Sequence, residues 1–314
     1  MVIILKKSET NPGFGKKPIM RTINELLKYG VVNLDKPSGP TSHQVVEFVE
    51  EILNVKKAGH SGTLDPKVTG VLPIMLGRGT KVIQAVLKAS KKYVCLAHFH
   101  KKITKRQVKL AVKQFTGEIT QLPPKKSNVK RVKRKRNVYS IDILEIKGND
   151  VLMIVECEAG TYIRKLIHDM GEFLGIGANM QELRRVKAGP FTEEMNLVTL
   201  QDLSDAMHYY KKNGNEKYLR FCVLPVEVAV SHLKKIWICD SAVKSLCQGA
   251  QLNLPGISKI DEGIEKGEFI AIMSLKGELV ALADALMSSN EMKKKKKGRA
   301  TKTRRVIMER GVYF

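Results

Sequence analysis

The sequence predicts an α+β protein in which one large mixed domain is followed by a small β-barrel. Strand-like and helix-like segments are mixed, and they do not follow the regular strand–helix–strand order that a parallel sheet requires. The chain has 314 residues, which favours one large domain plus a small one over a single core. From about Lys235, glycines separate short strand-like pieces, a pattern that suits a small barrel.

The first third of the chain begins with an extension and continues with a strand and a helix. Residues 1–20 have a mixed composition and no core pattern. Residues 31–34 form a short apolar strand, and residues 35–40 form a rigid polar turn after it. Thr41 and Gln44 match a capping box at the start of a helix. One face of this helix carries the apolar side chains Val45, Val46, Val49, Ile52 and Leu53.

The middle of the chain supplies further strands and helices of the large domain. Residues 91–99 alternate as a half-buried strand does, and residues 151–157 are typical of a buried strand. Apolar periodicity predicts helices at about 161–174 and 199–210. A polar stretch at 211–218 marks the change towards the small domain.

The charge of the chain points to a polyanionic partner. Lys and Arg number 55 against 31 Asp and Glu, a formal net charge of +24. Each phosphate that a basic side chain neutralises releases condensed counterions, so nucleic acid is favoured over an anionic membrane. Apolar stretches are too short to cross a bilayer, and the five scattered cysteines suit a reducing compartment. We therefore expect a cytoplasmic protein without a membrane partner.

Two segments concentrate the positive charge. Residues 125–136 carry eight Lys or Arg among twelve, and residues 293–305 carry nine among thirteen. A solvated or disordered loop is one interpretation, and a track along RNA phosphates is the other. The second interpretation makes these residues candidate RNA contacts: Lys130, Arg131, Lys133, Arg134, Arg299, Lys302, Arg304 and Arg305.

A loop with a single carboxylate is the first candidate for chemistry, because motifs for nucleotide, dinucleotide or zinc sites are absent from the sequence. It has the sequence GHSGTLDP and spans residues 59–66. Gly59 and Gly62 permit unusual backbone angles, and Pro66 restricts Asp65 to extended conformations. An ordinary Asp-Pro turn is the alternative interpretation of this loop.

The second candidate is Arg164, in the segment GTYIR that opens the predicted helix 161–174. A cation near the positive end of a helix macrodipole is disfavoured by roughly 0.3–1 kcal/mol. A local anion would offset this cost, and an Asp carboxylate or an RNA phosphate could supply it. A solvent-exposed arginine with a negligible penalty is the alternative.

The order of four segments resembles that of TruB/dyskerin-type pseudouridine synthases. These are KPSGPTS at 36–42, GHSGTLDPKVTG at 59–70, GTYIRKL at 160–166 and ELRR at 182–185. Residues 29–35 and 298–313 further resemble the archaeal-type catalytic subunit of the box H/ACA guide-RNA particle. The likeness implies an N-terminal extension at 1–27 that packs on a C-terminal PUA RNA-binding domain at 231–314. The catalytic domain, with its mixed sheet, would span 28–230.

By this resemblance, Asp65 is the catalytic carboxylate, Arg164 pairs with it, and Tyr93 contacts the target base. The resemblance also places other residues in the substrate pocket: Leu183 beside the uracil, His60 in the space left by the flipped nucleotide, Lys36 under the loop, and Tyr162. Isomerisation of uridine gains no atoms or electrons overall, so neither a cofactor nor a metal is expected. One ionised carboxylate can act as a nucleophile or take a sugar proton.

Three functions are compatible with these observations. The first is a guide-RNA-directed enzyme that modifies rRNA and possibly tRNA, with the small H/ACA ribonucleoprotein subunits, guide RNA and substrate RNA as partners. The second is a guide-independent tRNA pseudouridine synthase. The third is a non-catalytic RNA-binding scaffold, which the joint presence of Asp65, Tyr93 and Arg164 argues against.

Overall fold

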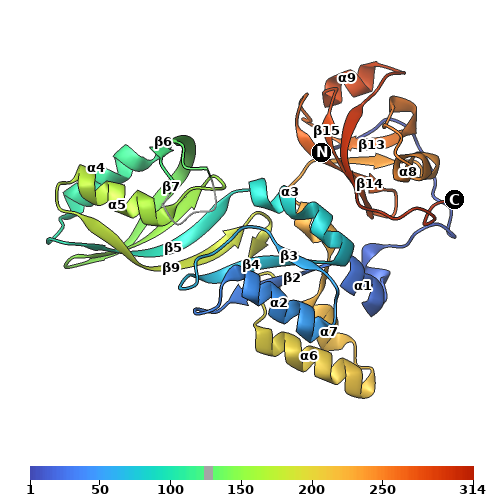
Figure 1. Ribbon diagram of the computed structural model, residues 1–314. Helices are drawn as coiled ribbons and strands as arrows, with labels where there is room; N and C mark the ends of the chain where they lie inside the picture. Colours follow the sequence, from blue (N-terminus) through green and yellow to red (C-terminus); the bar gives the residue numbers. More distant parts are fainter. Residues whose placement is uncertain (124–129) are drawn as a thin grey trace.

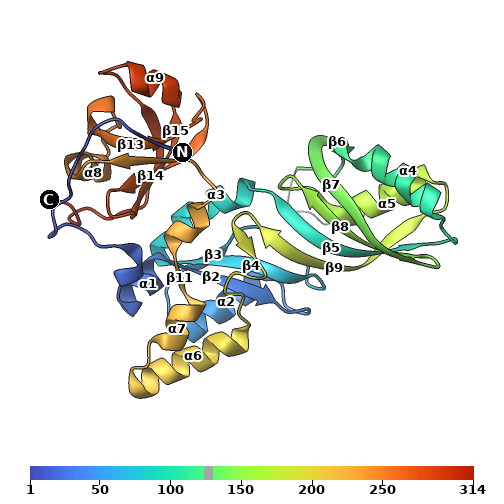
Figure 2. The ribbon, with the colours of Figure 1, turned by 180° about the vertical axis from the view of Figure 1, so that it is seen from behind.

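The computed structural model describes residues 1–123 and 130–314 and confirms the α+β class. The large domain is a mixed sheet with helices on it, and the small domain lies at one end of this sheet, near α1 (Ile23–Tyr29) and α3 (Ile83–Lys88) (Figures 1 and 2). Helices α4 and α5 cover the sheet at the opposite end, as both views show. Within the described residues, no helix is long and apolar enough to cross a membrane.

The large sheet has the strand order β11-β2-β4-β9-β5-β8-β7-β6, with β3 and β10 paired to β4 and β9. All of its pairs are antiparallel except the parallel contact between β4 and β9. Its strands are β2 (Gly30–Lys36), β3 (Ala58–His60), β4 (Thr69–Leu76), β5 (Lys91–Phe99), β6 (Gly117–Gln121), β7 (Arg134–Lys147), β8 (Asp150–Cys157), β9 (Ala178–Ala188), β10 (Phe191–Thr192) and β11 (Leu224–Pro225).

Two groups of helices cover this sheet. The first group packs on β2 and β4, and the second packs on β5 and β8 through a separate apolar cluster. The first comprises α1 (Ile23–Tyr29), α2 (Ser42–Leu53), α6 (Leu200–Asn213) and α7 (Lys217–Cys222), and the second comprises α4 (Lys105–Phe115) and α5 (Ile163–Phe173). The capping box at Thr41 and Gln44 is present, and Thr199 caps α6 in the same way. These predicted helix starts are therefore confirmed.

The small domain is built on a second sheet with the order β1-β13-β12-β14-β15-β16. Its members are β1 (Val2–Ile4), β12 (Lys235–Ile238), β13 (Ile257–Asp261), β14 (Phe269–Ser274), β15 (Leu279–Ala285) and β16 (Thr301–Val306). Two short helices, α8 (Asp240–Cys247) and α9 (Ser289–Lys294), accompany it and were not predicted. The basic segment 293–305 belongs to α9, β16 and their connection, so it is not a disordered loop.

The other basic segment is described only in part, because residues 124–129 lie outside the described residues. From Arg134 onwards the chain forms β7, whose Arg134–Val138 pairs with β6. The last residues of this segment are therefore in a strand, whereas the sequence had suggested a loop.

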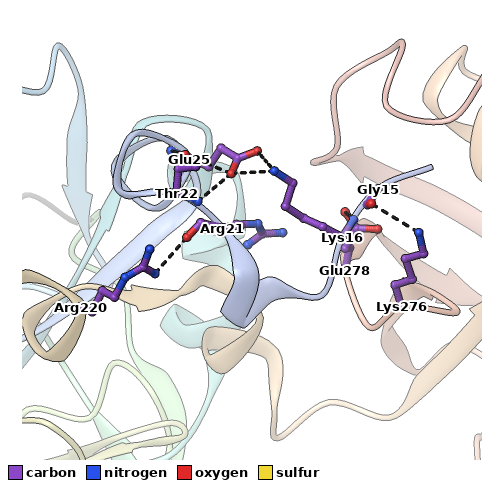
Figure 3. Close-up of polar contacts among 8 residues, drawn as sticks. All are labelled: Gly15, Lys16, Arg21, Thr22, Glu25, Arg220, Lys276 and Glu278. Atoms are coloured by element: carbon purple, nitrogen blue, oxygen red, sulfur yellow. Dashed lines mark hydrogen bonds and ion pairs between the residues drawn. The ribbon is translucent and has the colours of Figure 1, made fainter. Parts of the chain in front are cut away.

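The first twenty residues link the two domains. Strand β1 adds an edge strand to the small sheet by pairing with β13. Figure 3 shows the next stretch, where the Lys16 backbone nitrogen donates to Glu278 of the small domain and its side chain pairs with Glu25 of α1, at 3.2 and 2.8 Å. The side chain of Lys276 holds the same stretch by donating to the carbonyl of Gly15. We call residues 1–21 the N-terminal strap.

The strap ends in a nearly buried ion pair that also contacts the small domain. Arg21 binds both carboxylate oxygens of Glu227 at 2.7 and 2.8 Å, and Glu227 accepts from the Leu279 backbone nitrogen at 2.9 Å. The two side chains are 9% and 12% exposed. An apolar cluster that includes Val31, Met75 and Ile307 continues this contact between the domains.

Replacing Arg21 with methionine should therefore lower the free energy of unfolding by about 3 kcal/mol, because Glu227 would keep a buried charge without a partner. Thermal or urea unfolding measures the change. Lys16→Met, which removes a half-exposed pair with Glu25, is the control and should cost under about 1 kcal/mol. Equal losses in the two variants would show that the Arg21–Glu227 pair does not hold the domains together.

Candidate active site

The loop that carries Asp65 lies between β3 and β4, and its backbone is fixed on both sides of the carboxylate. Buried Ser42, at the start of α2, donates from its hydroxyl to the Leu64 carbonyl at 3.0 Å and accepts from the Leu64 nitrogen at 2.9 Å. The Val68 nitrogen donates to the Asp65 carbonyl at 3.0 Å. The Asp65 side chain itself is half-exposed, so a rigid backbone presents an open carboxylate.

Lys36 lies directly beneath this loop. Its side chain is fully buried and donates to the carbonyls of Pro37, Pro66 and Val68 at 2.8, 2.9 and 3.1 Å. Burial lowers the pKa of its ammonium group. The three carbonyls satisfy all three donors of the ammonium group, which joins the end of β2 to the segment that follows Asp65.

We expect Lys36→Met to destabilise the protein by about 2 kcal/mol, because three carbonyls would lose their buried donor. Displacement of the loop should also slow any reaction that depends on Asp65 by about 100-fold, the cost of misplacing a reacting group by about an ångström. Thermal unfolding and single-turnover rates measure the two effects. Lys67→Met, at an exposed position of the same loop, is the stability control. If both variants unfolded like the wild type, Lys36 would not support the loop.

Arg164 is the side chain that contacts Asp65. It lies in the first turn of α5, and its guanidinium forms an ion pair with the Asp65 carboxylate. Side chains of both residues are about half-exposed, at 55% and 52%. The carboxylate supplies the anion that a cation at a helix N-terminus requires. In turn, the guanidinium favours the ionised form of the aspartate.

The start of α5 is fixed by Gln121, the last residue of β6. Its buried amide donates to the Tyr162 carbonyl at 3.1 Å and accepts from the Tyr162 nitrogen at 2.9 Å. Tyr162 occupies the N-cap position, where its side chain makes no capping bond. Gln121 was not predicted from the sequence. The only available signal was that residue 162 is not a typical capping residue, so the start of the helix could be expected to bind a side chain from elsewhere in the chain. Through these two hydrogen bonds, β6 fixes the start of α5 and therefore the direction of the Arg164 side chain.

Tyr93 lies in β5, at the centre of the large sheet. Its side chain is only 9% exposed and belongs to the same apolar cluster as Leu64 of the loop that carries Asp65. Leu183, half-buried in β9, packs against this cluster. Burial raises the pKa of the Tyr93 phenol, and the nearby Arg185 guanidinium opposes the rise. The phenol is therefore neutral at pH 7.

His60 ends β3 and is half-buried. Its Nδ1 accepts from the Gly62 nitrogen at 3.4 Å, in the loop that carries Asp65. Burial and the charges of Arg185 and His43 lower its pKa, so the ring is neutral at pH 7. A neutral, half-buried ring at this position can fill space without carrying charge to the site.

The candidate RNA contacts are spread over two separate surfaces. Lys130, Arg131 and Lys133 are exposed ahead of β7, and Arg134 is half-buried at its start. On the small domain, four candidates are exposed: Arg299, Lys302, Arg304 and Arg305. Arg304 pairs with Asp284 at 2.6 Å, which reduces the charge it can offer to a phosphate.

Sequence profiles of known families match most of the chain. The profile of the TruB family pseudouridylate synthase N-terminal domain matches residues 50–163, and that of the tRNA pseudouridylate synthase B C-terminal domain matches 164–231. A PUA domain profile matches 234–307, and a DKCLD domain profile matches 1–46.

Individual proteins are similar over almost their whole length. A protein of Nanoarchaeum equitans named "Probable tRNA pseudouridine synthase B" is 54% identical, over 99% of this chain and 88% of its own. One of the same name from Pyrococcus abyssi is also 54% identical, over 98% and 92%.

Two solved structures share the fold. The crystal structure of an archaeal box H/ACA sRNP Nop10–Cbf5 complex has a chain with a TM-score of 0.93 and 51% identity, covering 100% of this chain and 97% of that one. A structure of an H/ACA RNP bound to a substrate RNA containing 2′-deoxyuridine has a TM-score of 0.93 and 49% identity, over 100% and 96%. Given this likeness along the whole chain, the protein belongs to the TruB family of pseudouridylate synthases.

Proposed function

We propose that this pseudouridine synthase is the catalytic subunit of an H/ACA ribonucleoprotein, which isomerises guide-selected uridines in rRNA. The proposed chemistry rests on the half-exposed ion pair between Asp65 and Arg164. The loop that carries Asp65 is held by the buried side chain of Lys36, which donates to two of its carbonyls. The observation that favours guided selection is the likeness to chains solved in H/ACA complexes with Nop10, Gar1 and substrate RNA. The partners would accordingly be guide RNA, substrate RNA and small protein subunits, and the compartment the cytoplasm.

The reaction breaks the bond from the sugar to N1 of uracil, rotates the base, and forms a bond from the sugar to C5. The C5 proton leaves and N1 gains one, so atoms and electrons balance without an oxidant. The uridine must first leave its stack, at a cost of a few kcal/mol that contacts to RNA repay. The Asp65 carboxylate then attacks as a nucleophile or takes a sugar proton, and Arg164 fixes its direction through their ion pair.

The other pocket residues have roles that their surroundings support. Tyr93 and Leu183 would contact the uracil from the sheet side, where they share an apolar cluster. His60 would fill the space that the flipped nucleotide leaves, since its ring is half-buried and neutral. We assign the catalytic domain to residues 28–230, the PUA domain to 231–314, and the extension that packs on it to 1–27.

A guide-independent tRNA pseudouridine synthase is the second candidate, and the names of the curated relatives favour it. The chain should be incubated with uridine-containing rRNA fragments and with tRNA, each with and without an H/ACA guide RNA and the small protein subunits. Product only with the guide selects the first function, whereas modification of bare tRNA alone selects the second. A lack of pseudouridine in every arm would leave an RNA-binding scaffold.

The exposed cations of β16 test the contribution of the small domain to RNA binding. Changing Lys302 and Arg305 together to glutamine should weaken guide-RNA binding and make its salt dependence shallower by about two phosphates. Filter binding at several salt concentrations measures the slope. The control is Lys259→Gln on β13, which removes a cation that lies over the Trp237 ring of β12. An unchanged slope for the β16 variant would mean that this strand does not touch phosphate.

A further inference from the structure

Arg185 is the largest fully buried side chain of the described residues, and its position connects the parts of the site. It lies in β9 with 1% exposure, opposite Tyr93 of β5 on one side and Gly70 of β4 on the other. Its Nε donates to the Val71 carbonyl at 2.7 Å, and its Nη2 donates to the Gly62 carbonyl at 3.1 Å. Gly62 belongs to the loop that carries Asp65, three positions before that residue.

The same guanidinium lies next to Tyr93, because the two residues are direct partners on neighbouring strands and their side chains share one face of the sheet. A guanidinium has only donors, so the phenol can offer Arg185 only its oxygen, as an acceptor. The hydroxyl proton of Tyr93 is therefore free to point away from Arg185. A register shift between Lys92 and Tyr93 marks a bulge at this point of β5, and bulges commonly re-aim a side chain.

The contribution of Arg185 to stability does not by itself explain why this cation is buried. A second buried cation, Lys91, lies close by and donates to the carbonyls of Val86, Leu87 and Ala89 at 2.8, 2.8 and 2.7 Å. Burial and the charge of Arg185 lower the pKa of Lys91 to about 7. Within the described residues, no carboxylate pairs with Arg185, and its guanidinium donates instead to the carbonyls of Val71 and Gly62. Well-packed apolar side chains would stabilise a core at least as well as an unpaired cation does.

The backbone also adapts to Arg185. Gly70 has a φ of +101°, and a Cβ built on it would lie 2.2 Å from the Arg185 carbonyl oxygen. Strand β9 can therefore approach β4 closely only because residue 70 is a glycine. This approach brings the Arg185 side chain within reach of both Gly62 and Tyr93.

We infer that Arg185 is a positioning residue of the isomerisation, which ties the Tyr93 hydroxyl to the Gly62 carbonyl and so fixes the phenol relative to Asp65. The inference rests on the proposed function, in which both side chains face the same uridine. Arg185 acts through these two groups and does not touch substrate. Its loss should therefore change the rate of the chemical step more than the affinity for RNA.

The test uses single-turnover pseudouridine formation at saturating substrate RNA, with guide RNA and the small subunits present. Arg185→Met removes all donors, and Arg185→Lys keeps the charge but cannot reach Gly62 and Tyr93 together. We expect the methionine variant to be about 100-fold slower and the lysine variant about 10-fold slower, while Kd for RNA stays within about threefold of the wild type. The matched control is Arg184→Lys, on the outer face of the same strand, where the side chain pairs with Asp35 and Glu193.

A double-mutant cycle separates this role from a purely structural one. If Arg185 works through the phenol, Arg185→Lys should add little to the loss that Tyr93→Phe causes on its own. Additive losses, or a wild-type rate for a folded Arg185→Lys variant, would overturn the inference. Thermal unfolding checks that each variant is folded, and the lysine variant decides the question if the methionine variant does not fold. A wild-type protein without activity would instead refute the proposed function.

Discussion

The Asp65→Asn variant is expected to form no measurable pseudouridine, with a rate at least about 10⁴-fold below that of the wild type. The amide cannot act as a nucleophile or accept a proton, so the chemical step has no substitute group. RNA affinity should stay within a few-fold, because phosphate contacts on distant surfaces supply most of it. Single-turnover product formation and filter binding measure the two quantities separately.

The fold should tolerate this change, since the Asp65 side chain is half-exposed and the surrounding backbone is held by Ser42 and Lys36. Asp142→Asn, at an exposed carboxylate of β7, is the matched control and should react at the wild-type rate. An Asp65→Asn enzyme that retained the wild-type rate would refute the assignment of the catalytic group.

Replacing Arg164 with methionine should slow the reaction by about 10²–10³-fold, the usual cost of removing one preorganised charge at a reacting centre. Asp65 would lose the guanidinium that favours its ionised form and fixes its direction. Arg164→Lys should recover only part of the rate, because an ammonium group cannot reproduce the planar fork of a guanidinium. Single-turnover rates with saturating RNA measure both variants.

The control for this series is Lys165→Met. Lys165 is the next cation in the first turn of α5, and it pairs with Asp169 one turn along the helix. Its removal should leave the rate within about threefold of the wild type, the scale of a surface ion pair. Equal losses of rate in the two methionine variants would mean that any change in the first turn of α5 slows the reaction, and Arg164 would then have no specific role in the site.

Most of the large domain could be predicted from the sequence because its signals are local. The alternating residues 91–99 form β5, and Thr41 and Thr199 cap helices where the sequence places them. Asp65 and Arg164 belong to quoted motifs, so their pairing could be expected before any coordinates. Short helices α8 and α9 could not, because eight and six residues are too few for a clear period.

The buried polar groups of the site were harder to predict because their partners are distant in the chain. Strand β9 carries Glu182, Arg184, Arg185 and Lys187, charges that hide its strand character. Nothing in this pattern shows that Arg185 is buried while Arg184 is half-exposed. That distinction depends on the carbonyls of Gly62 and Val71, more than 110 positions earlier in the chain. Gln121 was missed for the same reason.

The pairing of β1 with β13 has a consequence for how the chain folds during synthesis. Residues 2–4 are synthesised well before their strand partner, residues 259–261, which lies far along the chain. The rings of Phe14 and Phe314 meet as well, with centroids 5.0 Å apart. The small domain can therefore be completed only after residue 314 has been synthesised, and until then residues 2–4 remain without a strand partner. Expressed alone from residue 231, this domain would lack that strand and expose β13 to self-association.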